Sequence, residues 1–148
     1  MIHHTQFVAG LIRSGQLSLN AAAFQGKKIT FHDPCYLGRG NKEYEAPRTV
    51  LHAMTPRLAE MKACKSFALC CGAGGGQMFK EAEKGNKEVF IERIEQAIET
   101  GADIIATACP YCMVMMTDGI KYKNKEEALK NYDIAELVSI GIPGLSTF

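Results

Sequence analysis

The sequence has no excess of charge of either sign, since 17 lysines and arginines face 16 aspartates and glutamates. That balance creates no field strong enough to favour nucleic acid or an anionic membrane surface as a partner. The sequence also lacks any apolar run of about 18 residues, which excludes a hydrophobic helix that crosses a bilayer. Its first 15 residues hold neither a basic region nor a long apolar stretch, so we expect no secretory signal and a cytoplasmic location.

What the chain does have is cysteine. Its 148 residues suit one domain, and a domain of this size buries roughly 70% of its unfolded surface without needing covalent staples. Six cysteines are therefore many, and without an export signal disulfides are not expected. Reduced thiolates that hold a metal or cluster, or a catalytic dithiol, are the favoured interpretations.

Helical and extended patterns alternate along the chain, which predicts right-handed crossovers and a parallel sheet. We expect an α/β fold: a small three-layer, Rossmann-like domain with three or four parallel strands. Pro47 suits the first turn of its helix, Pro56 should break or kink that helix, and Gly101 suits a helix C-terminus. Helices are predicted over 8–15, 47–61, 87–103, 109–120 and 126–142, and strands over 27–35, 66–70 and 103–108.

Five cysteines follow these predicted strands. Cys35 follows the first, Cys70 and Cys71 follow the second, and Cys109 and Cys112 follow the third. Because the carboxyl ends of parallel strands share one edge of a sheet, five sulfurs should converge there. A thiolate-rich site of this kind selects zinc or an iron–sulfur cluster. The sixth cysteine, Cys64, has no partner in this pattern and is interpreted as a space-filling residue.

Three chemistries compete for these sulfurs. Structural zinc needs four thiolates and would leave the fifth idle. Residues 109–112, Cys-Pro-Tyr-Cys, are similar to the active site of a glutaredoxin, although the chain after them is too short and too helical for that fold. The glycine-rich stretch at 72–76 lacks the Gly-Lys-Ser/Thr end of a phosphate-binding loop. An iron–sulfur cluster is the third possibility, and it would use all five.

The cysteine-containing segments resemble a known family. Residues 32–39 read "HDPCYLGR", residues 70–76 read "CCGAGGG" and residues 106–112 read "ATACPYC". These segments and their spacing are similar to the cysteine-rich CCG domain of heterodisulfide reductase subunits and related iron–sulfur oxidoreductases. The likeness covers residues 1 to about 140. It implies a [4Fe–4S] cluster, in some members non-cubane, whose ligands here would be Cys35, Cys70, Cys71, Cys109 and Cys112.

The resemblance also implies a larger protein. Full-length members carry two copies of this domain and a ferredoxin-like segment, whereas this sequence has one copy and no CxxCxxCxxxCP run. Residues 1–148 are therefore expected to form a single CCG domain, the C-terminal part of a longer iron–sulfur protein. Residues 91–121 are similar to members linked to electron-transfer flavoprotein and acyl-CoA oxidation. The implied partners are a flavoprotein, the other domains and a disulfide or quinone acceptor, with membrane association through the parent protein. An isolated domain produced in air is expected to lose an oxygen-sensitive cluster, which leaves the five thiols empty, oxidised or occupied by zinc.

Two further features near the cysteines are open to a functional or a structural interpretation. His32 and Asp33 could hydrogen-bond a cluster sulfur or donate a proton, or they could simply form a local turn. The glycines at 72 and 74–76 are interpreted as letting backbone N–H groups approach the sulfurs.

Overall fold

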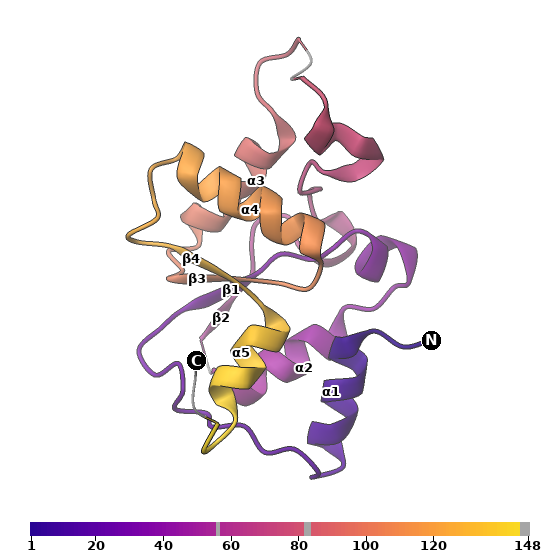
Figure 1. Cartoon of the computed structure of the whole chain (residues 1–148), viewed down its shortest axis with the longest axis vertical. Helices are drawn as coiled ribbons and strands as arrows, with labels where there is room; N and C mark the ends of the chain where they lie inside the picture. The colour runs from indigo at the N-terminus through magenta and orange to yellow at the C-terminus, as the bar shows by residue number, and fades with distance from the viewer. Residues whose placement is uncertain (56, 82–83, 146–148) are drawn as a thin grey trace.

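A computed structural model describes residues 1–55, 57–81 and 84–145 of the chain. Its centre is a sheet of four strands in the order β2-β1-β3-β4, and every neighbouring pair is parallel (Figure 1). The expected α/β fold with a parallel sheet is confirmed. The strands are β1 (Ile29–Phe31), β2 (Leu58–Ala59), β3 (Ile104–Thr107) and β4 (Lys130–Asp133).

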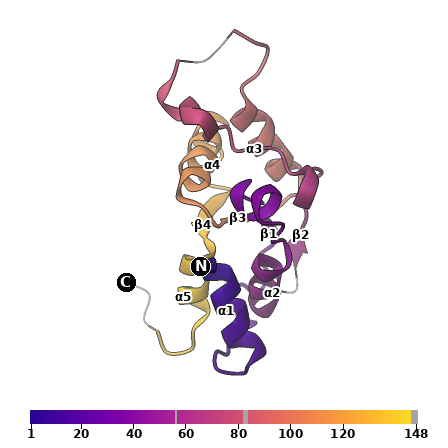
Figure 2. The same cartoon turned by 90° about the vertical axis from the view of Figure 1, so that its right-hand side faces the viewer.

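Helices cover both faces of the sheet, so the domain has the three layers that the sequence predicts. Three helices pack on one face and two on the other, on opposite sides of the strands in Figures 1 and 2. The first group is α1 (His4–Arg13), α2 (Glu45–Met54) and α5 (Ile134–Gly141); the second is α3 (Val89–Glu99) and α4 (Pro110–Tyr122). Among the described residues, no helix is both long and apolar enough to cross a membrane.

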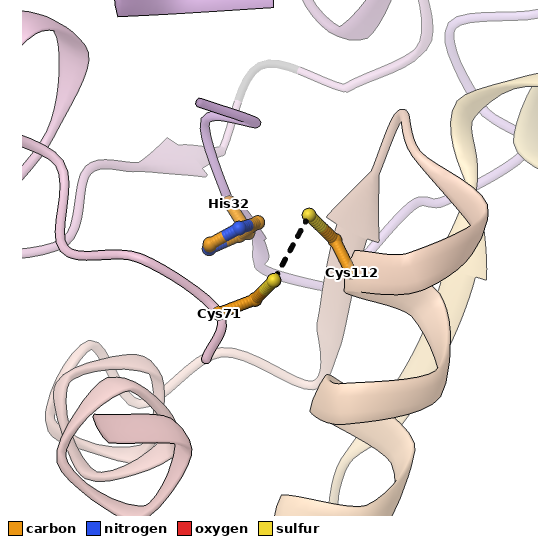
Figure 3. A group of neighbouring side chains, drawn as sticks. All are labelled: His32, Cys71 and Cys112. Carbon is orange, nitrogen blue, oxygen red and sulfur yellow. Dashed lines mark hydrogen bonds between the residues drawn. The ribbon is translucent and has the colours of Figure 1, made fainter. Parts of the chain in front are cut away.

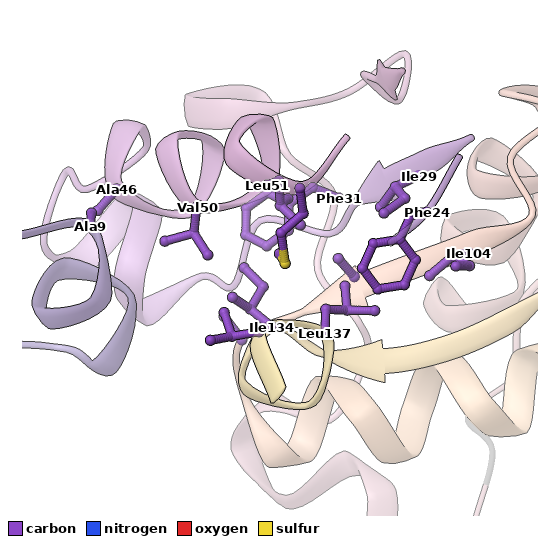
Figure 4. Packing of buried hydrophobic residues seen from close by; sticks show 14 of the residues in the cluster. Ala9, Phe24, Ile29, Phe31, Ala46, Val50, Leu51, Ile104, Ile134 and Leu137 are labelled. Carbon is purple, nitrogen blue, oxygen red and sulfur yellow. The ribbon is translucent and has the colours of Figure 1, made fainter. Parts of the chain in front are cut away.

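The face under α1, α2 and α5 is packed with hydrocarbon and aromatic side chains (Figure 4). Ile29 and Phe31 of β1 and Ile104 of β3 point to this face, and Leu51 of α2 and Leu137 of α5 close over them. All but Ile104 are fully buried. Burial of this kind contributes about 1.5–3 kcal/mol per large side chain. We call this packing the lower cluster.

The opposite face, under α3 and α4, has a core of a different composition. Alternation along β3 turns Ile105 toward this face, where it packs with Ile94 of α3 and Met116 of α4. The same cluster includes two of the candidate site residues, Cys71 and Cys112. We call it the upper cluster. Because the upper cluster contains Cys71 and Cys112, this part of the candidate site lies in the hydrophobic core and not on the surface.

The clearest helix predicted from the sequence is confirmed with its expected end. α3 spans Val89–Glu99, and Gly101 adopts a φ of +65°, which favours glycine after a helix. Pro47 lies in the first turn of α2, as predicted, where no intrahelical hydrogen bond is lost. The break expected at Pro56 lies outside the described residues, but α2 already ends at Met54 and Thr55 is extended.

The strand predicted at 66–70 is wrong. The second strand is Leu58–Ala59, which pairs with β1, and Lys65–Phe67 forms one turn of 3₁₀-helix instead. Side chains rather than a sheet ladder hold this segment: the Lys65 backbone N–H donates to Asp33 at 2.8 Å, and the Ala63 carbonyl accepts from Arg93 at 2.7 Å. Cys70 and Cys71 therefore reach the sheet edge on a long loop after β2.

Two helix predictions also extend too far. Residues 58–59 belong to β2 rather than to the helix predicted over 47–61. The helix predicted over 126–142 contains a strand, β4 (Lys130–Asp133), before the real helix α5 begins at Ile134. Backbone pairing with β3 outweighs the local helical pattern there, and a capping box at Asp133 starts α5 directly after the strand.

Candidate functional site

Three segments far apart in the sequence bring the candidate cysteines to one edge of the sheet. Cys35 lies just after β1, at the start of a single π-helical turn over Tyr36–Gly40. Cys109 is the residue before the first turn of α4, and Cys112 lies within that turn. Cys70 and Cys71 arrive on the loop after β2. All six cysteines of the chain are free thiols.

Four of these thiols follow one another in a chain, and its two central members are joined by a hydrogen bond. The Cys112 Sγ donates to the Cys71 Sγ at 3.5 Å, and both residues are buried. Cys109 lies beside Cys112 at one end and Cys70 lies beside Cys71 at the other, and each of these contacts shifts the pKa of the thiols involved. Cys35 lies close enough for its charge to raise the pKa of Cys70 slightly, after the larger effects of the Cys71 contact and burial. The structure thus brings four of the five predicted cysteines into one group, and Cys35 reaches the same edge of the sheet.

The acidities of these thiols differ because each has different neighbours. Hydrogen bonds from Cys112, Cys70 and His32 lower the pKa of Cys71, so Cys71 is the thiolate of the buried pair. Cys112 has a raised pKa because its thiol donates to Cys109 and Cys71. At the start of α4, the hydrogen bond from Cys112 and the backbone N–H groups of Cys112 and Tyr111 lower the pKa of Cys109 to about 6.

His32 joins this group from the end of β1. One of its ring nitrogens and the sulfurs of Cys71 and Cys112 all lie within 4.8 Å of one another, and Figure 3 shows the three side chains pointing together. His32 is fully buried, and its contact with Cys71 acts on the pKa of both groups. Its pKa is lowered, mainly by burial, so the ring is neutral. A role near the sulfurs is one of the two interpretations that the sequence leaves open, and this contact favours it.

A second residue, Arg93 of α3, lies behind His32. Its side chain is completely buried, and its Nε donates to His32 Nδ1 at 2.9 Å. Its Nη1 donates to the Ala63 carbonyl at 2.7 Å and to Gln96 Oε1 at 2.9 Å. Burial lowers the pKa of Arg93 to about 10. Sequence reasoning missed this residue, although Arg93 lies three residues after Phe90 and four before Ala97, on the predicted apolar face.

Asp33 has a structural role. Both of its carboxylate oxygens accept from Arg48, at 2.8 and 3.0 Å, and one also accepts from the Lys65 backbone N–H. Arg48 in turn donates to both oxygens of Glu60, at 2.6 and 2.8 Å. Cys64 lies half-buried beside this network, and burial raises its pKa. It makes no contact with the chain of four thiols among the hydrogen bonds of the described residues.

In the glycine-rich stretch, only Gly72 brings its backbone N–H to a sulfur, and the other glycines do not. Gly72 has a φ of +92°, and its backbone N–H donates to the Cys70 Sγ at 3.3 Å. The next N–H, of Ala73, hydrogen-bonds to Cys71. Gly74, Gly75 and Gly76 form an exposed turn in which an added Cβ would meet nothing within 4 Å. The expected approach of backbone to sulfur therefore belongs to residues 72–73.

A cavity of about 750 Å³ opens beside this stretch. Cys70 and Gly72 lie on its wall, together with Phe90 of α3 and Met115 of α4, and Lys87 adds a charge. Cys70 is thus the thiol that lines this cavity, whereas Cys71 and Cys112 are buried. A molecule in this cavity would approach the sulfurs from the Cys70 side.

The donor set fits a soft metal or a metal–sulfur group. The buried sulfurs of Cys71 and Cys112 and the His32 imidazole lie within 4.8 Å of one another, and the other three cysteines are partly buried. No carboxylate hydrogen-bonds to any of the five thiols among the residues that the structure describes. Such sets favour zinc, copper(I) or iron–sulfur clusters over magnesium or calcium. Two backbone N–H groups already point at sulfur, which is the kind of surrounding that tunes a cluster.

Comparisons with known proteins give relatives for this chain. It is 41% identical over 143 residues to the "Probable iron-sulfur-binding oxidoreductase FadF" of Bacillus subtilis (strain 168), covering 96% of this chain and 20% of that protein. It is 37% identical over 142 residues to the EtfAB:quinone oxidoreductase of Syntrophomonas wolfei, covering 92% and 20%. A subunit of the dihydromethanophenazine:CoB–CoM heterodisulfide reductase of Methanosarcina barkeri is 39% identical over 156 residues, covering 99% and 35%.

By name, the first relative is an iron–sulfur-binding oxidoreductase, the second a quinone oxidoreductase and the third a heterodisulfide reductase subunit, and the chain spans about a fifth of the length of the first two. Residues 29–117, from β1 into α4, match the cysteine-rich domain family known as CCG. This range contains every candidate cysteine, His32 and Arg93. The chain therefore belongs to the CCG family of cysteine-rich domains.

Proposed function

We propose that this domain transfers electrons within an iron–sulfur oxidoreductase, and that Cys35, Cys70, Cys71, Cys109 and Cys112 hold a [4Fe–4S] cluster, cubane or non-cubane. The observation that carries the proposal is that these free thiols reach one edge of the sheet from three separate segments, four of them as neighbours in one chain. A zinc ion would use four of the five. A polynuclear cluster gives the fifth a role.

The partners proposed are a flavoprotein on one side and a disulfide or quinone on the other. The names of the relatives support them: one is an EtfAB:quinone oxidoreductase and another is a heterodisulfide reductase subunit. A bound cluster would supply one-electron chemistry. Reduction of a disulfide to two thiols takes two electrons and two protons, so two transfers from the flavoprotein are needed for each disulfide.

The chain's own residues would hold and tune this group. The lowered pKa of Cys109 keeps it a thiolate at neutral pH, ready to ligate without losing a proton. The Gly72 N–H hydrogen-bonds to the Cys70 sulfur and stabilises its negative charge. The surrounding upper cluster excludes water from Cys71 and Cys112, while the cavity beside Cys70 gives an acceptor access.

We further propose that residues 1–148 are one CCG domain of a longer protein with a second copy and a ferredoxin-like segment. The coverage of the relatives supports this, since the chain matches only 20% of two of them. The site would then face the other domains on the cytoplasmic side of a membrane, with the membrane association provided by the parent protein.

Anaerobic reconstitution with iron and sulfide, followed by metal analysis and EPR, tests the proposal. We expect about four irons and four sulfides per chain. Cys71→Ser should abolish this uptake, and Cys64→Ser is the matched control that should retain it, because Cys64 lies outside the chain of four thiols. Protein that takes up no iron and binds one zinc tightly, with Cys71→Ser unaffected, would show a zinc-binding interaction module instead.

One observation favours a second candidate, a thiol–disulfide oxidoreductase that uses the Cys-Pro-Tyr-Cys pair. Cys109 has a pKa of about 6 and is half-buried, while Cys112 is buried with a raised pKa, which suits an attacking and a resolving thiol. This function predicts reduction of a small disulfide by metal-free protein: two thiols are oxidised to one disulfide as the substrate gains two electrons and two protons. It also predicts that Cys35→Ser leaves this activity intact.

A further inference from the structure

Arg93 carries a positive charge into the core without a carboxylate to balance it. Its side chain has no exposed surface, and its hydrogen-bond partners among the described residues are an imidazole, a carbonyl and an amide. Its Nη2 is buried with no hydrogen-bond partner in the described part of the chain. A buried guanidinium in such a setting is costly unless a negative charge lies nearby.

The groups whose negative charge favours that of Arg93 are Asp33 and three cysteines, Cys64, Cys112 and Cys71. Asp33 is already bound at both oxygens by Arg48. Cys64 and Cys112 have raised pKa values and stay protonated, so the remaining negative charge belongs to the Cys71 sulfur. Arg93 thus has an electrostatic reason to lie behind the thiol group, and His32 is the residue that connects the two.

The contact between Arg93 and His32 fixes which nitrogen of the ring carries the proton. An arginine Nε–H can only donate, so His32 Nδ1 must accept at the observed 2.9 Å. A neutral ring that accepts at Nδ1 carries its proton on Nε2. A ring nitrogen of His32 lies within 4.8 Å of the Cys71 sulfur, so Nε2–H is the donor that the ring offers to that sulfur.

The same contact prevents His32 from acting as a ligand. A histidine that binds a metal through Nε2 needs the proton on Nδ1, and here Nδ1–H would face the Arg93 Nε–H, donor against donor. Binding through Nδ1 would displace Arg93 from its buried position. His32 lies within 4.8 Å of two sulfurs, yet its geometry suits a donor to sulfur and not a bond to metal.

We propose that Arg93 is a positioning residue that fixes His32 as a hydrogen-bond donor to the Cys71 sulfur, so that His32 tunes the sulfur centre and does not ligate it. The assignment of the proton holds for the metal-free protein. The effect on a cluster rests on the proposed function. A hydrogen bond to a ligand sulfur stabilises the more negative, reduced state and raises the reduction potential.

The first test needs no metal. Long-range ¹H–¹⁵N NMR of ¹⁵N-histidine-labelled protein, kept reduced, distinguishes a protonated from an unprotonated ring nitrogen, and His32→Gln identifies the His32 signals. We expect Nε2 protonated and Nδ1 unprotonated. A ring protonated at Nδ1 would overturn the proposal. This result stands whether or not the protein binds iron, so failure of the proposed function and failure of this inference are distinguishable.

The second test compares two variants after anaerobic reconstitution. In His32→Gln, the amide places an N–H near the position of the imidazole Nε2 and retains an oxygen acceptor for Arg93, whereas His32→Leu removes both contacts. We expect both variants to retain iron. His32→Leu should make the equilibrium constant for one-electron reduction about tenfold smaller, a shift of about 59 mV to more negative potential. His32→Gln should stay within about threefold of the unsubstituted protein.

Loss of iron in both variants would show that His32 ligates, and an unchanged potential in His32→Leu would show that it does not tune the centre. Either outcome overturns the proposal. Arg93→Met adds a readout that a purely structural role would not move. It removes the Nε–H that fixes the ring, so the NMR spectrum should show a mixture of the two protonation forms at His32.

Discussion

Each face of the sheet buries one arginine from a covering helix, and the two faces balance its charge differently. Arg48 of α2, on the side of the lower cluster, is held by Asp33 and Glu60 through four hydrogen bonds and lies over the Phe31 ring at 5.4 Å. Arg93 of α3, on the side of the upper cluster, has no carboxylate partner in the described part of the chain. The charge of Arg48 is balanced by carboxylates within the fold. The charge of Arg93 is balanced only by the sulfur of the site.

The difference extends to the cores around these arginines. The lower cluster is made of aliphatic and aromatic side chains, with Met54 as its one sulfur-containing member, and serves stability alone. The upper cluster includes Cys71, Cys112 and several methionines, so the same packing both stabilises the domain and encloses the site. Substitutions on the two faces should therefore separate stability from sulfur chemistry.

Removal of each arginine should give the largest contrast. Arg48→Met leaves the buried Asp33 carboxylate without its cation and should lower the free energy of unfolding by about 3–5 kcal/mol. Arg93→Met strands no carboxylate. It removes donors from the Ala63 carbonyl and from Gln96, and we expect a loss of about 1–2 kcal/mol. Urea denaturation of the two variants measures both values.

The conservative change Arg48→Lys is a control that separates the effect of the positive charge from that of the planar guanidinium geometry. Lysine retains the positive charge but cannot bridge two carboxylates in the same plane, so it should recover only part of the loss. An equal cost for Arg48→Met and Arg93→Met would contradict the distinction between the two faces.

Truncation of one core residue on each face should come next in size. Leu51→Ala in the lower cluster and Met116→Ala in the upper cluster both create cavities at fully buried positions, and each should cost about 2–5 kcal/mol. Only Met116→Ala should also reduce iron retention after reconstitution, because Met116 packs in the cluster that contains Cys71 and Cys112. If both variants lose iron in proportion to their loss of stability, the two faces of the sheet do not differ in their effect on the site.

A smaller loss of stability is expected when a glycine of the glycine-rich stretch is replaced by alanine. Gly72→Ala places a side chain at a φ of +92° with its Cβ 3.3 Å from the Phe90 backbone N, which should cost about 1–3 kcal/mol. Gly74→Ala is the matched control, because an added Cβ there meets nothing within 4 Å. Thermal unfolding of the metal-free proteins should place Gly74→Ala close to the unsubstituted protein. Equal melting temperatures for the two variants would contradict a special role of the Gly72 backbone.

The smallest perturbation is a change of pH in metal-free, reduced protein. Cys109, whose pKa is lowered to about 6, should react with iodoacetamide at a rate that is nearly constant above about pH 7 and falls as the pH drops through 6. Because the folded pKa lies below the ordinary thiol value, its thiolate contributes stability that is present at high pH and is lost as the pH falls through the folded pKa. Mass spectrometry of alkylated peptides measures the profile. Cys112, with a raised pKa, serves as the internal comparison and should stay unmodified.

The sequence predicts the elements whose periodicity and ends agree. The α3 helix and the strands β1 and β3 have clear apolar patterns bounded by glycine or proline, and the structure contains all of them. The segment 66–70 has an equally apolar composition, but Phe67 is exposed and the loop is held by Asp33 and Arg93. A local pattern carries no information about such distant side-chain bonds.

The residues of the candidate site also fall into those that the sequence predicts and those that it does not. Cys35, Cys109 and Cys112 could be placed at one edge because each follows a predicted strand that the structure contains. Cys70 and Cys71 reach the same edge although the strand predicted just before them is wrong. That the five cysteines are ligands stays a prediction. Arg93 could not be predicted, because an arginine on an amphipathic helix ordinarily lies in solvent and only the tertiary contact with His32 gives it a role. The interpretation of the glycine-rich stretch fits Gly72 and is too broad at 74–76, since positive φ there serves an exposed turn.

The loop that carries Cys70 and Cys71 has one more consequence. Its first half is tied to the domain by side-chain contacts with Asp33 and Arg93 and not by a β-ladder, so it forms a separate cooperative unit of lower stability. Amide hydrogens near residues 63–73 should exchange with solvent at a lower opening free energy than those of β1 and β3. Two of the sulfurs can thus become accessible while the sheet stays folded, which lets metal enter and leave without unfolding the whole domain.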